Sequence, residues 1–232
     1  MFHYENAWQE VMDRIVRAAQ KAGRNPGDVR LLAVSKTFPP EAIRAVHALG
    51  QRHFGENYVQ EGSGKMDVLS DLADVSWHLI GPVQSNKAGM AAVRFAWVHS
   101  VDRAKIALRL SAARPADAPP LNVCVQVNAS SEASKSGVAP AAAVALAQTV
   151  AALPRLKLRG IMGIPKPTAD PVRRRLQFRV LSHSLDACKA AGLSVDTLSM
   201  GMSDDLEDAI AEGATLVRVG TAIFGARAQQ GG

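Results

Sequence analysis

The sequence predicts an α/β protein of the (β/α)8 TIM-barrel class. Eight short apolar runs recur after residue 29, and a stretch with helical spacing of apolar residues follows each run. Polar residues or glycines come directly after most of the runs, which is where a barrel carries its active site. The length of 232 residues is near that typical of such a barrel. We therefore expect one domain over residues 1–232.

An amphipathic helix is expected over residues 1–20, ahead of the first strand. This segment contains acids and no continuous apolar core, so it is not typical of a signal peptide. The expected strands cover residues 31–35, 53–55, 77–80, 97–99, 121–128, 157–164, 197–198 and 216–219. The expected helices include residues 41–49, 58–72, 102–113, 140–152, 171–191 and 204–212. A doubly wound open sheet is the alternative fold, although no GxGxxG fingerprint follows an early strand.

The charge distribution argues against a nucleic-acid partner. Lys and Arg total 27 against 21 acids, which gives a net charge of +6, but these charges are spread along the chain. The one compact basic run, residues 173–175, lies in an expected helix with few aromatic residues nearby to stack on bases. We interpret this run as a solvated helix face. A mildly basic protein of this kind suits an anionic ligand.

The sequence gives no support for a membrane segment, a disulfide or a metal site. Residues 138–153 are apolar, but they are alanine-rich and too few to span a bilayer. Cys124 and Cys188 are far apart and lack CxxC spacing, which favours buried neutral thiols in a reducing compartment. The six histidines form no HxH or HExxH pair. We expect a soluble, cytoplasmic protein.

Lys36 stands at the end of the first expected strand. The apolar run 31–35 precedes it, and Pro39 and Pro40 interrupt the chain shortly after it. A lysine in this position directs its amine to the face of the barrel where active sites lie. Partial desolvation lowers the pKa of such an amine, which can then attack an aldehyde as a neutral nucleophile. The alternative is a lysine that merely extends into water at a strand end.

The loops after the seventh and eighth expected strands have the residues for a phosphate site. Barrels often bind phosphate there, next to the N-terminus of a short helix. Gly220 lets backbone amides approach an anion, and Thr221 offers a hydroxyl. In the seventh loop, Ser199 offers a second hydroxyl and Gly201 adds flexibility.

Ser203 in the same loop has a different interpretation. It comes directly before the expected helix 204–212, and serine is a preferred N-cap residue. Asp204 and Asp205 are favourable in the first turn of a helix, but they make this helix start a poor anion site. We therefore expect Ser203 to act mainly as the cap.

Arg218 lies inside the eighth expected strand, between Val217 and Val219. Because side chains alternate along a strand, its side chain faces the opposite side from the two valines. If that side is the barrel interior, the buried charge needs a partner or a ligand. One explanation is an ion pair with an acid on a neighbouring strand, such as Glu56. The other is contact with an anionic or heteroaromatic ligand, and the two are compatible.

An amine and a phosphate site at one barrel mouth suggest a phosphorylated aldehyde or ketone held as a Schiff base. Two chemistries meet this description. One is pyridoxal phosphate, bound as a cofactor. The other is a sugar phosphate on a lysine-dependent aldolase.

Six blocks of the sequence resemble the pyridoxal-phosphate homeostasis protein family and run in the family's order. The blocks are AVSKT at 33–37, FGENYVQE at 54–61, WHLIGPVQSNK at 77–87, SKSG at 134–137, LSMGMSDD at 198–205 and VRVGTAIFG at 217–225. They extend over nearly the whole chain, and together they are highly specific. The family is similar in fold to the N-terminal barrel of alanine racemase.

The resemblance implies a cofactor site at the ends of the first, second, seventh and eighth strands. Its members are Lys36, Asn57, Ser199, Met200, Gly201, Arg218, Gly220 and Thr221. In this site Lys36 would hold pyridoxal 5′-phosphate as an aldimine, Arg218 would meet the pyridine nitrogen, and Asn57 would line the ring. The remaining residues would bind the phosphate. No residue is expected to be catalytic.

The function implied by the resemblance is binding of pyridoxal phosphate and maintenance of intracellular vitamin B6 balance, without substantial turnover. Arg218 agrees with this, because a guanidinium does not readily give up a proton and leaves the ring nitrogen a weak electron sink. We expect no second domain of the kind that racemases use to close their site. The two tyrosines, Tyr4 and Tyr58, both fall early in the chain. A pyridoxal-phosphate-dependent amino-acid racemase is the alternative function.

The expected ligand is pyridoxal phosphate, and apo pyridoxal-phosphate enzymes are candidate recipients of it. A monomer is expected, because nothing in the sequence marks a second subunit's contribution to the site. His78 is interpreted as a structural histidine, and Phe38 stands where some relatives carry a further lysine. Four other lysines are interpreted as solvated, with a second aldehyde site as the alternative: Lys65, Lys87, Lys135 and Lys166.

Overall fold

The computed structural model describes residues 3–130 and 136–226. Eight parallel strands form a closed barrel in the order β1 to β8, and β1 pairs with β8 in the register Ala33↔Val219. The strands are β1 (Arg30–Val34), β2 (His53–Glu56), β3 (Ser76–Leu79), β4 (Trp97–Val101), β5 (Leu121–Gln126), β6 (Leu156–Met162), β7 (Thr197–Ser199) and β8 (Leu216–Val219). The closure confirms the predicted (β/α)8 barrel, and the alternative of an open sheet is wrong.

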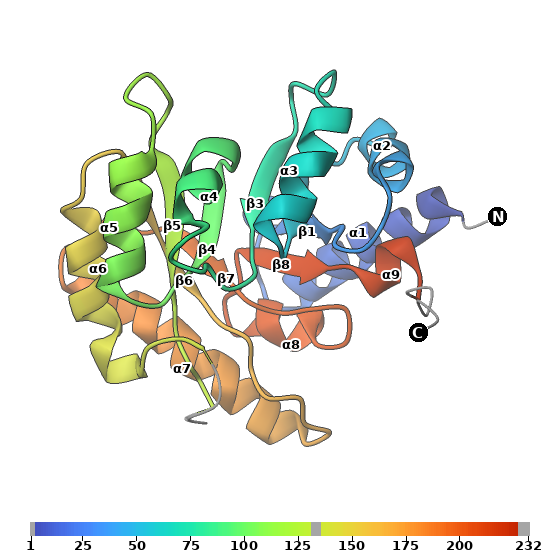
Figure 1. The fold of residues 1–232 in the computed structure, drawn as a ribbon. Helices are drawn as coiled ribbons and strands as arrows, with labels where there is room; N and C mark the ends of the chain where they lie inside the picture. The colour runs from blue at the N-terminus through green and yellow to red at the C-terminus, as the bar shows by residue number, and fades with distance from the viewer. Residues whose placement is uncertain (1–2, 131–135, 227–232) are drawn as a thin grey trace, which may run out of the picture.

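Helices cover the outside of the barrel, as Figure 1 shows. They are α1 (Tyr4–Lys21), α2 (Pro40–Ala48), α3 (Val59–Val68), α4 (Ala88–Arg94), α5 (Ala104–Ala113), α6 (Ala143–Ala151), α7 (Pro171–Ala190), α8 (Leu206–Ala211) and α9 (Thr221–Phe224), with single 3-10 turns η1 (Pro26–Asp28) and η2 (Pro140–Ala142). The expected extra N-terminal helix is confirmed as α1, which packs beside α8 and α9. Arg14 of α1 pairs with Glu207 of α8 at 2.7 Å. In the described part of the chain, no helix is both long and apolar enough to cross a membrane.

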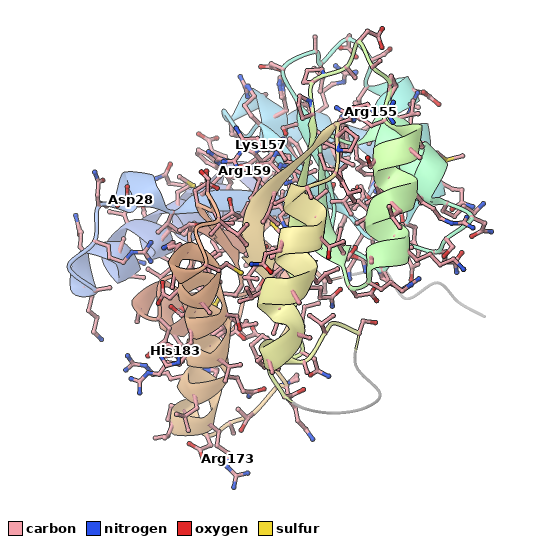
Figure 2. All side chains as sticks on the ribbon, turned by 90° about the vertical axis from the view of Figure 1, so that its left-hand side faces the viewer. Asp28, Arg155, Lys157, Arg159, Arg173 and His183 are labelled. Atoms are coloured by element: carbon pink, nitrogen blue, oxygen red, sulfur yellow. The ribbon has the colours of Figure 1, made fainter. Side chains whose placement is uncertain are left out.

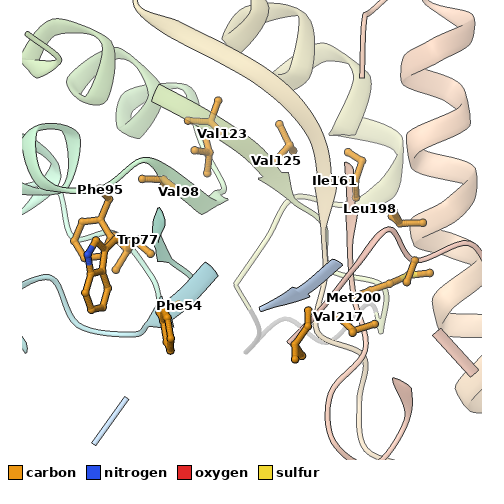
Figure 3. Packing of buried hydrophobic residues seen from close by; sticks show 14 of the residues in the cluster. Phe54, Trp77, Phe95, Val98, Val123, Val125, Ile161, Leu198, Met200 and Val217 are labelled. Atoms are coloured by element: carbon orange, nitrogen blue, oxygen red, sulfur yellow. The ribbon is translucent and has the colours of Figure 1, made fainter. Parts of the chain in front are cut away.

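The alternation of side chains along β1 separates the two sides of the barrel wall. Leu31 and Ala33 belong to the large buried cluster between strands and helices, whereas Val34 lines a cavity at the barrel mouth. Figure 3 shows part of the outer cluster, including Phe54 of β2 and Trp77 of β3, whose ring centroids are 6.1 Å apart. Burial of this cluster supplies the main hydrophobic stabilisation and fixes the strand ends that carry the cavity.

The barrel interior below the mouth contains three histidines that we call the imidazole row: His53 of β2, His78 of β3 and His99 of β4. His53 Nδ1 lies 3.0 Å from His78 Nε2, and His78 Nδ1 lies 2.9 Å from His99 Nε2. The ring of Trp97 stacks on His78, with centroids 5.1 Å apart. His78 and His99 are fully buried. The structural interpretation of His78 agrees with this position.

Burial keeps the imidazole row neutral. It lowers the pKa of His99 to about 3 and the pKa of His53 to about 4. Burial also lowers the pKa of His78 well below its ordinary value, and the neighbouring His99 adds to the effect. In the unfolded chain these imidazoles return to an ordinary pKa of about 6.5. The unfolded chain therefore binds protons that the folded chain excludes, so the row lowers stability as the pH falls below that value.

Gly160 of β6 marks a close approach to the neighbouring strand. Its φ is +152°, and a Cβ there would lie 1.9 Å from the Thr197 carbonyl oxygen of β7. We expect Gly160→Ala to lower the free energy of unfolding by about 2–4 kcal/mol, because the backbone of β7 must move. Gly64→Ala is the matched control, because nothing lies within 4 Å of that exposed position on α3, and it should raise stability by about 0.5–1 kcal/mol. Chemical denaturation measures both, and wild-type stability of Gly160→Ala would contradict the contact.

The neutral imidazoles predict a pH-dependent stability. Each fully buried imidazole should cost the fold about 1.4 kcal/mol per pH unit below pH ~6.5, so His99→Asn should remove one such contribution. Urea denaturation at several pH values between about 6.5 and 4.5 measures the slope. His183→Asn is the matched control, since His183 is exposed on α7 (Figure 2), and it should keep the wild-type slope. Equal slopes for His99→Asn and wild type would mean that His99 is protonated in the folded protein.

Candidate cofactor-binding site

A cavity of about 530 Å³ opens at the carboxyl ends of the strands. Its lining residues come from, or directly after, every strand except β4. They are Val34, Lys36, Asn57, Ile80, Gly81, Pro82, Gln126, Asn128, Ser136, Ile164, Met202, Ser203, Asp204, Arg218, Gly220 and Thr221. The volume is in the range of small-molecule sites.

Five of the eight residues implied by the resemblance meet in this cavity: Lys36, Asn57, Arg218, Gly220 and Thr221. The other three lie behind the cavity wall. The Ser199 hydroxyl is buried against Arg218 and His99, and Met200 is part of the outer core. Gly201 adopts φ +90°, and a Cβ there would lie 2.5 Å from the Ala209 Cβ, so it faces α8. The same loop lines the cavity through its next residues, 202–204.

The backbone on both sides of Lys36 is bound by helix α3. The carbonyl of Ser35 accepts a hydrogen bond from Lys65 Nζ at 2.7 Å. The N–H of Thr37 donates to Glu61 Oε1, and Thr37 adopts the left-handed φ of +68°. These contacts end β1 with a fixed turn, and they hold the Lys36 backbone at the rim of the cavity.

The expectation that Lys65 is solvated is wrong, because Lys65 lies in a buried ion cluster. Its amine also contacts Glu56 Oε1 at 2.9 Å and Glu61 Oε1 at 2.8 Å, and only 7% of the residue is exposed. The Ser35 hydroxyl donates to Glu56 Oε1 at 2.7 Å. Burial raises the pKa of Glu56, and Lys65 offsets part of this effect. Three hydrogen-bond acceptors therefore occupy the Lys65 amine.

The remaining lysines of the second-site alternative do not line the cavity where the structure describes them. Lys87 is half-buried at the start of α4, and Lys166 is exposed after β6. Lys135 lies outside the described residues. Lys36 is thus the lysine that the described part of the barrel brings to the cavity.

Arg218 is held by neutral oxygen atoms. Its Nη1 donates to the Ser199 carbonyl at 2.7 Å and to the Ser199 hydroxyl at 2.8 Å, and its Nη2 donates to the Gly163 carbonyl at 2.9 Å. Burial lowers the pKa of Arg218 to about 10, and Asp205 acts in the opposite direction, so the side chain stays charged near neutral pH. The ion pair with Glu56 proposed from the sequence is wrong, because Glu56 belongs to the Lys65 cluster. The guanidinium charge is therefore available to a ligand.

Gly220 and Thr221 form the turn between β8 and α9. The Gly220 carbonyl accepts from the N–H groups of Ile223 and Phe224, both at 2.9 Å. A Cβ on Gly220 would lie 3.1 Å from the Val34 carbonyl oxygen, so glycine allows the turn to lie against β1. The two hydrogen bonds to the Gly220 carbonyl leave the N–H groups of Thr221 and Ala222 as the donors that begin the helix. With the Thr221 hydroxyl, they form a set of donors at the cavity edge.

The prediction that Ser203 caps a helix is wrong. Helix α8 begins at Leu206, its N-cap residue is Asp205, and residues 203–205 form a turn ahead of it. Asp205 Oδ1 accepts from the N–H of Met202 at 2.6 Å, which closes this turn. The Ser203 carbonyl accepts from Arg14 Nη2 at 2.8 Å, and Ser203 lines the cavity.

Sequence reasoning missed Gln126 and Ile164 as lining residues. A signal for Gln126 was present. The expected strand 121–128 ends at Asn128, and a residue two positions earlier faces the same side of a strand. In the structure this strand ends at Gln126 because the Asn128 side chain accepts the N–H of Ser130 at 3.2 Å and turns the chain. Ile164 follows β6 and is 42% exposed.

Comparison with known proteins identifies the family of this chain. Residues 9–228 match the family model described as the alanine racemase N-terminal domain. The pyridoxal phosphate homeostasis protein of Pseudomonas aeruginosa is 59% identical over 218 residues, which covers 94% of this chain and 93% of that protein.

Two solved structures are similar over nearly the whole chain. A protein of Bifidobacterium adolescentis has a TM-score of 0.90 and 38% identity, and the match covers 95% of this chain and 94% of that one. PipY of Synechococcus elongatus PCC7942, solved with PLP bound, has a TM-score of 0.79 and 38% identity, and the match covers 91% and 100%. The chain therefore belongs to the pyridoxal phosphate homeostasis protein family, whose fold is that of the alanine racemase N-terminal domain.

Proposed function

We propose that this protein binds pyridoxal 5′-phosphate at the mouth of its barrel, and that it serves intracellular vitamin B6 homeostasis. The observation that carries the proposal is the position of Lys36, the lysine that lines the cavity together with the Arg218 guanidinium. The relatives support the choice of ligand. PipY was solved with PLP bound, and the Pseudomonas aeruginosa protein is named for pyridoxal phosphate homeostasis.

The chemistry of the cavity fits this cofactor. When bound, pyridoxal phosphate supplies an aldehyde, which an amine such as that of Lys36 can attack with loss of water. Arg218 offers N–H donors to a ring nitrogen. Beside Val34, Gly220 leaves the space that a Cβ would fill, and Thr221 offers a hydroxyl for the phosphate.

We assign the phosphate to the Gly220–Thr221 turn and to the loop after β7. The three residues expected from that loop, Ser199 to Gly201, lie behind the wall, so its contribution would come from the lining residues Met202 and Ser203. Asn57 would line the ring from the side of β2. This assignment keeps the family's placement of the phosphate and changes the residues that contact it.

We infer that the protein is a cofactor carrier and has no substantial turnover. Arg218 stays protonated near neutral pH, so it donates to a ring nitrogen and does not hand over a proton. An unprotonated ring is a weak electron sink, which disfavours the racemase alternative that the family model's name suggests. Tyr4 and Tyr58, which are both described, are absent from the cavity lining, so neither is placed to act as a base there.

We further propose a monomer in the cytoplasm that passes the cofactor to apo pyridoxal-phosphate enzymes. One chain lines the cavity from seven of its eight strands, which supports a site that needs no second subunit. Cys124 and Cys188 are buried free thiols, and burial raises the pKa of Cys124 to about 12, which suits a reducing compartment.

Lys36→Ala should abolish covalent retention of pyridoxal phosphate, because Lys36 supplies the amine in the cavity. Wild-type protein incubated with the cofactor, reduced with borohydride and digested should carry the label on Lys36 by mass spectrometry. Lys166→Ala is the matched control, since Lys166 is exposed and does not line the cavity, and its labelling should equal that of wild type.

Label on another lysine of the wild-type protein would overturn the assignment to Lys36. The same loaded protein, incubated with L-alanine, should leave the circular dichroism of the solution unchanged over many molar equivalents. Steady racemisation would support the racemase alternative and sink the carrier proposal, whatever the labelling shows.

Thr221→Val tests the phosphate assignment, because valine keeps the shape of threonine and removes its hydroxyl. We expect it to weaken binding of pyridoxal phosphate by about 1–3 kcal/mol, the usual loss for a hydrogen bond to a charged group. Thr149→Val, on helix α6, is the matched control and should bind as wild type does. Equilibrium titration of the visible absorbance measures the affinities, and equal affinity for Thr221→Val would refute the assignment.

A further inference from the structure

The imidazole row continues through Ser199 to Arg218, so hydrogen bonds join five side chains across the barrel. His99 Nδ1 lies 3.0 Å from the Ser199 hydroxyl oxygen, and Arg218 Nη1 lies 2.8 Å from the same oxygen. His99 comes from β4 and Ser199 from β7, on the far side of the barrel. The network therefore links Arg218, which lines the cavity, to four buried or half-buried side chains that do not line it.

In each hydrogen bond of this network, the donor is the group nearer to Arg218 along the chain of contacts. A guanidinium can only donate, so the Ser199 hydroxyl oxygen accepts from Arg218. The hydroxyl proton then has one partner in reach, which is His99 Nδ1. If His99 Nδ1 carried the proton, the Ser199 hydroxyl would have no acceptor in the described structure, although Ser199 is fully buried. The arrangement that satisfies every group makes His99 Nδ1 an acceptor.

The same reasoning passes along the imidazole row. A neutral imidazole has one donor and one acceptor, so His99 donates from Nε2 to His78 Nδ1, and His78 donates from Nε2 to His53 Nδ1. Ser76 lies 3.4 Å from His78 Nε2 and can share that proton. Each imidazole thus turns its lone pair towards Arg218, and aligned dipoles of this kind stabilise a cation.

The rings in the row cannot easily rotate. Trp97 stacks on His78 at an interplanar angle of 12°, and its centroid lies 5.7 Å from that of His99. Arg159 covers Trp97, with its Cζ 4.7 Å from the ring centroid. A fixed His99 fixes the Ser199 hydroxyl, and the hydroxyl sets one end of the Arg218 guanidinium.

We propose that His99 and His78 are positioning residues that act through Ser199 to orient Arg218 towards the ring nitrogen of bound pyridoxal phosphate. The inference rests on the proposed function, because it needs that ligand in the cavity. It goes beyond the ligand site, since neither histidine lines the cavity. The row is neutral and leaves the net charge of this cluster positive, whereas a carboxylate in the same place would balance that charge.

Two probes separate positioning from a general structural role. One is pyridoxal 5′-phosphate, and the other is its deaza analogue, in which a C–H group replaces the ring nitrogen. His99→Phe should weaken binding of pyridoxal phosphate about 10-fold or more and change that of the analogue less than about 2-fold. His99→Gln should largely restore binding, because an amide can accept from Ser199 and donate to His78. His183→Phe, at an exposed position, is the matched control.

Equal losses for both probes, or no loss for either, would overturn the proposal. If wild type binds neither probe, the proposed function has failed. A measurement without ligand then tests the direction of the hydrogen bonds in the imidazole row. Nitrogen-15 NMR of the imidazoles should find His78 and His99 neutral, with the proton on Nε2. Protons on Nδ1 would refute the orientation of the row, even if His99→Phe does not fold.

Discussion

The burial of Arg218 is the constraint on which the site depends. A cation removed from water needs compensating hydrogen bonds, and here the partners are two Ser199 oxygens and the Gly163 carbonyl. All of these atoms are neutral, so the positive charge persists at the floor of the cavity. His99 extends this set of partners, because its Nδ1 lies 3.0 Å from the Ser199 hydroxyl oxygen that Arg218 contacts.

Lys36 and Lys65 carry the same amine but lie on opposite sides of the barrel wall. Lys65 lies on the helix side, where Glu56 and Glu61 balance its charge and the Ser35 carbonyl takes another of its protons. Lys36 lies on the cavity side, one residue beyond Ser35. Because neighbouring side chains face opposite sides, Ser35 contacts the Lys65 cluster whereas Lys36 lines the cavity.

The barrel and the rim residues were predictable because their signals are local. Lys36 follows an apolar run, and Gly220 and Thr221 follow another. The contact between His99 and Ser199 could not be read from the sequence, since it joins residues 100 positions apart and depends on the stagger of strands around the barrel. The misplaced Ser203 cap has a local cause. Residues 203–205 add a turn that a preference for serine at helix starts does not reveal.

Helix α3 also anchors one side of the rim, at the end of β1. Its side chains bind the backbone before and after Lys36. A displacement of this segment would therefore break contacts of the Lys65 ion cluster. On the opposite side of the rim, Ile164 follows β6 and is 42% exposed. A ligand that leaves while the Lys65 ion pairs stay intact would pass Asn128 and Ile164. These two lining residues follow β5 and β6, the strands farthest around the barrel from β1 and β2.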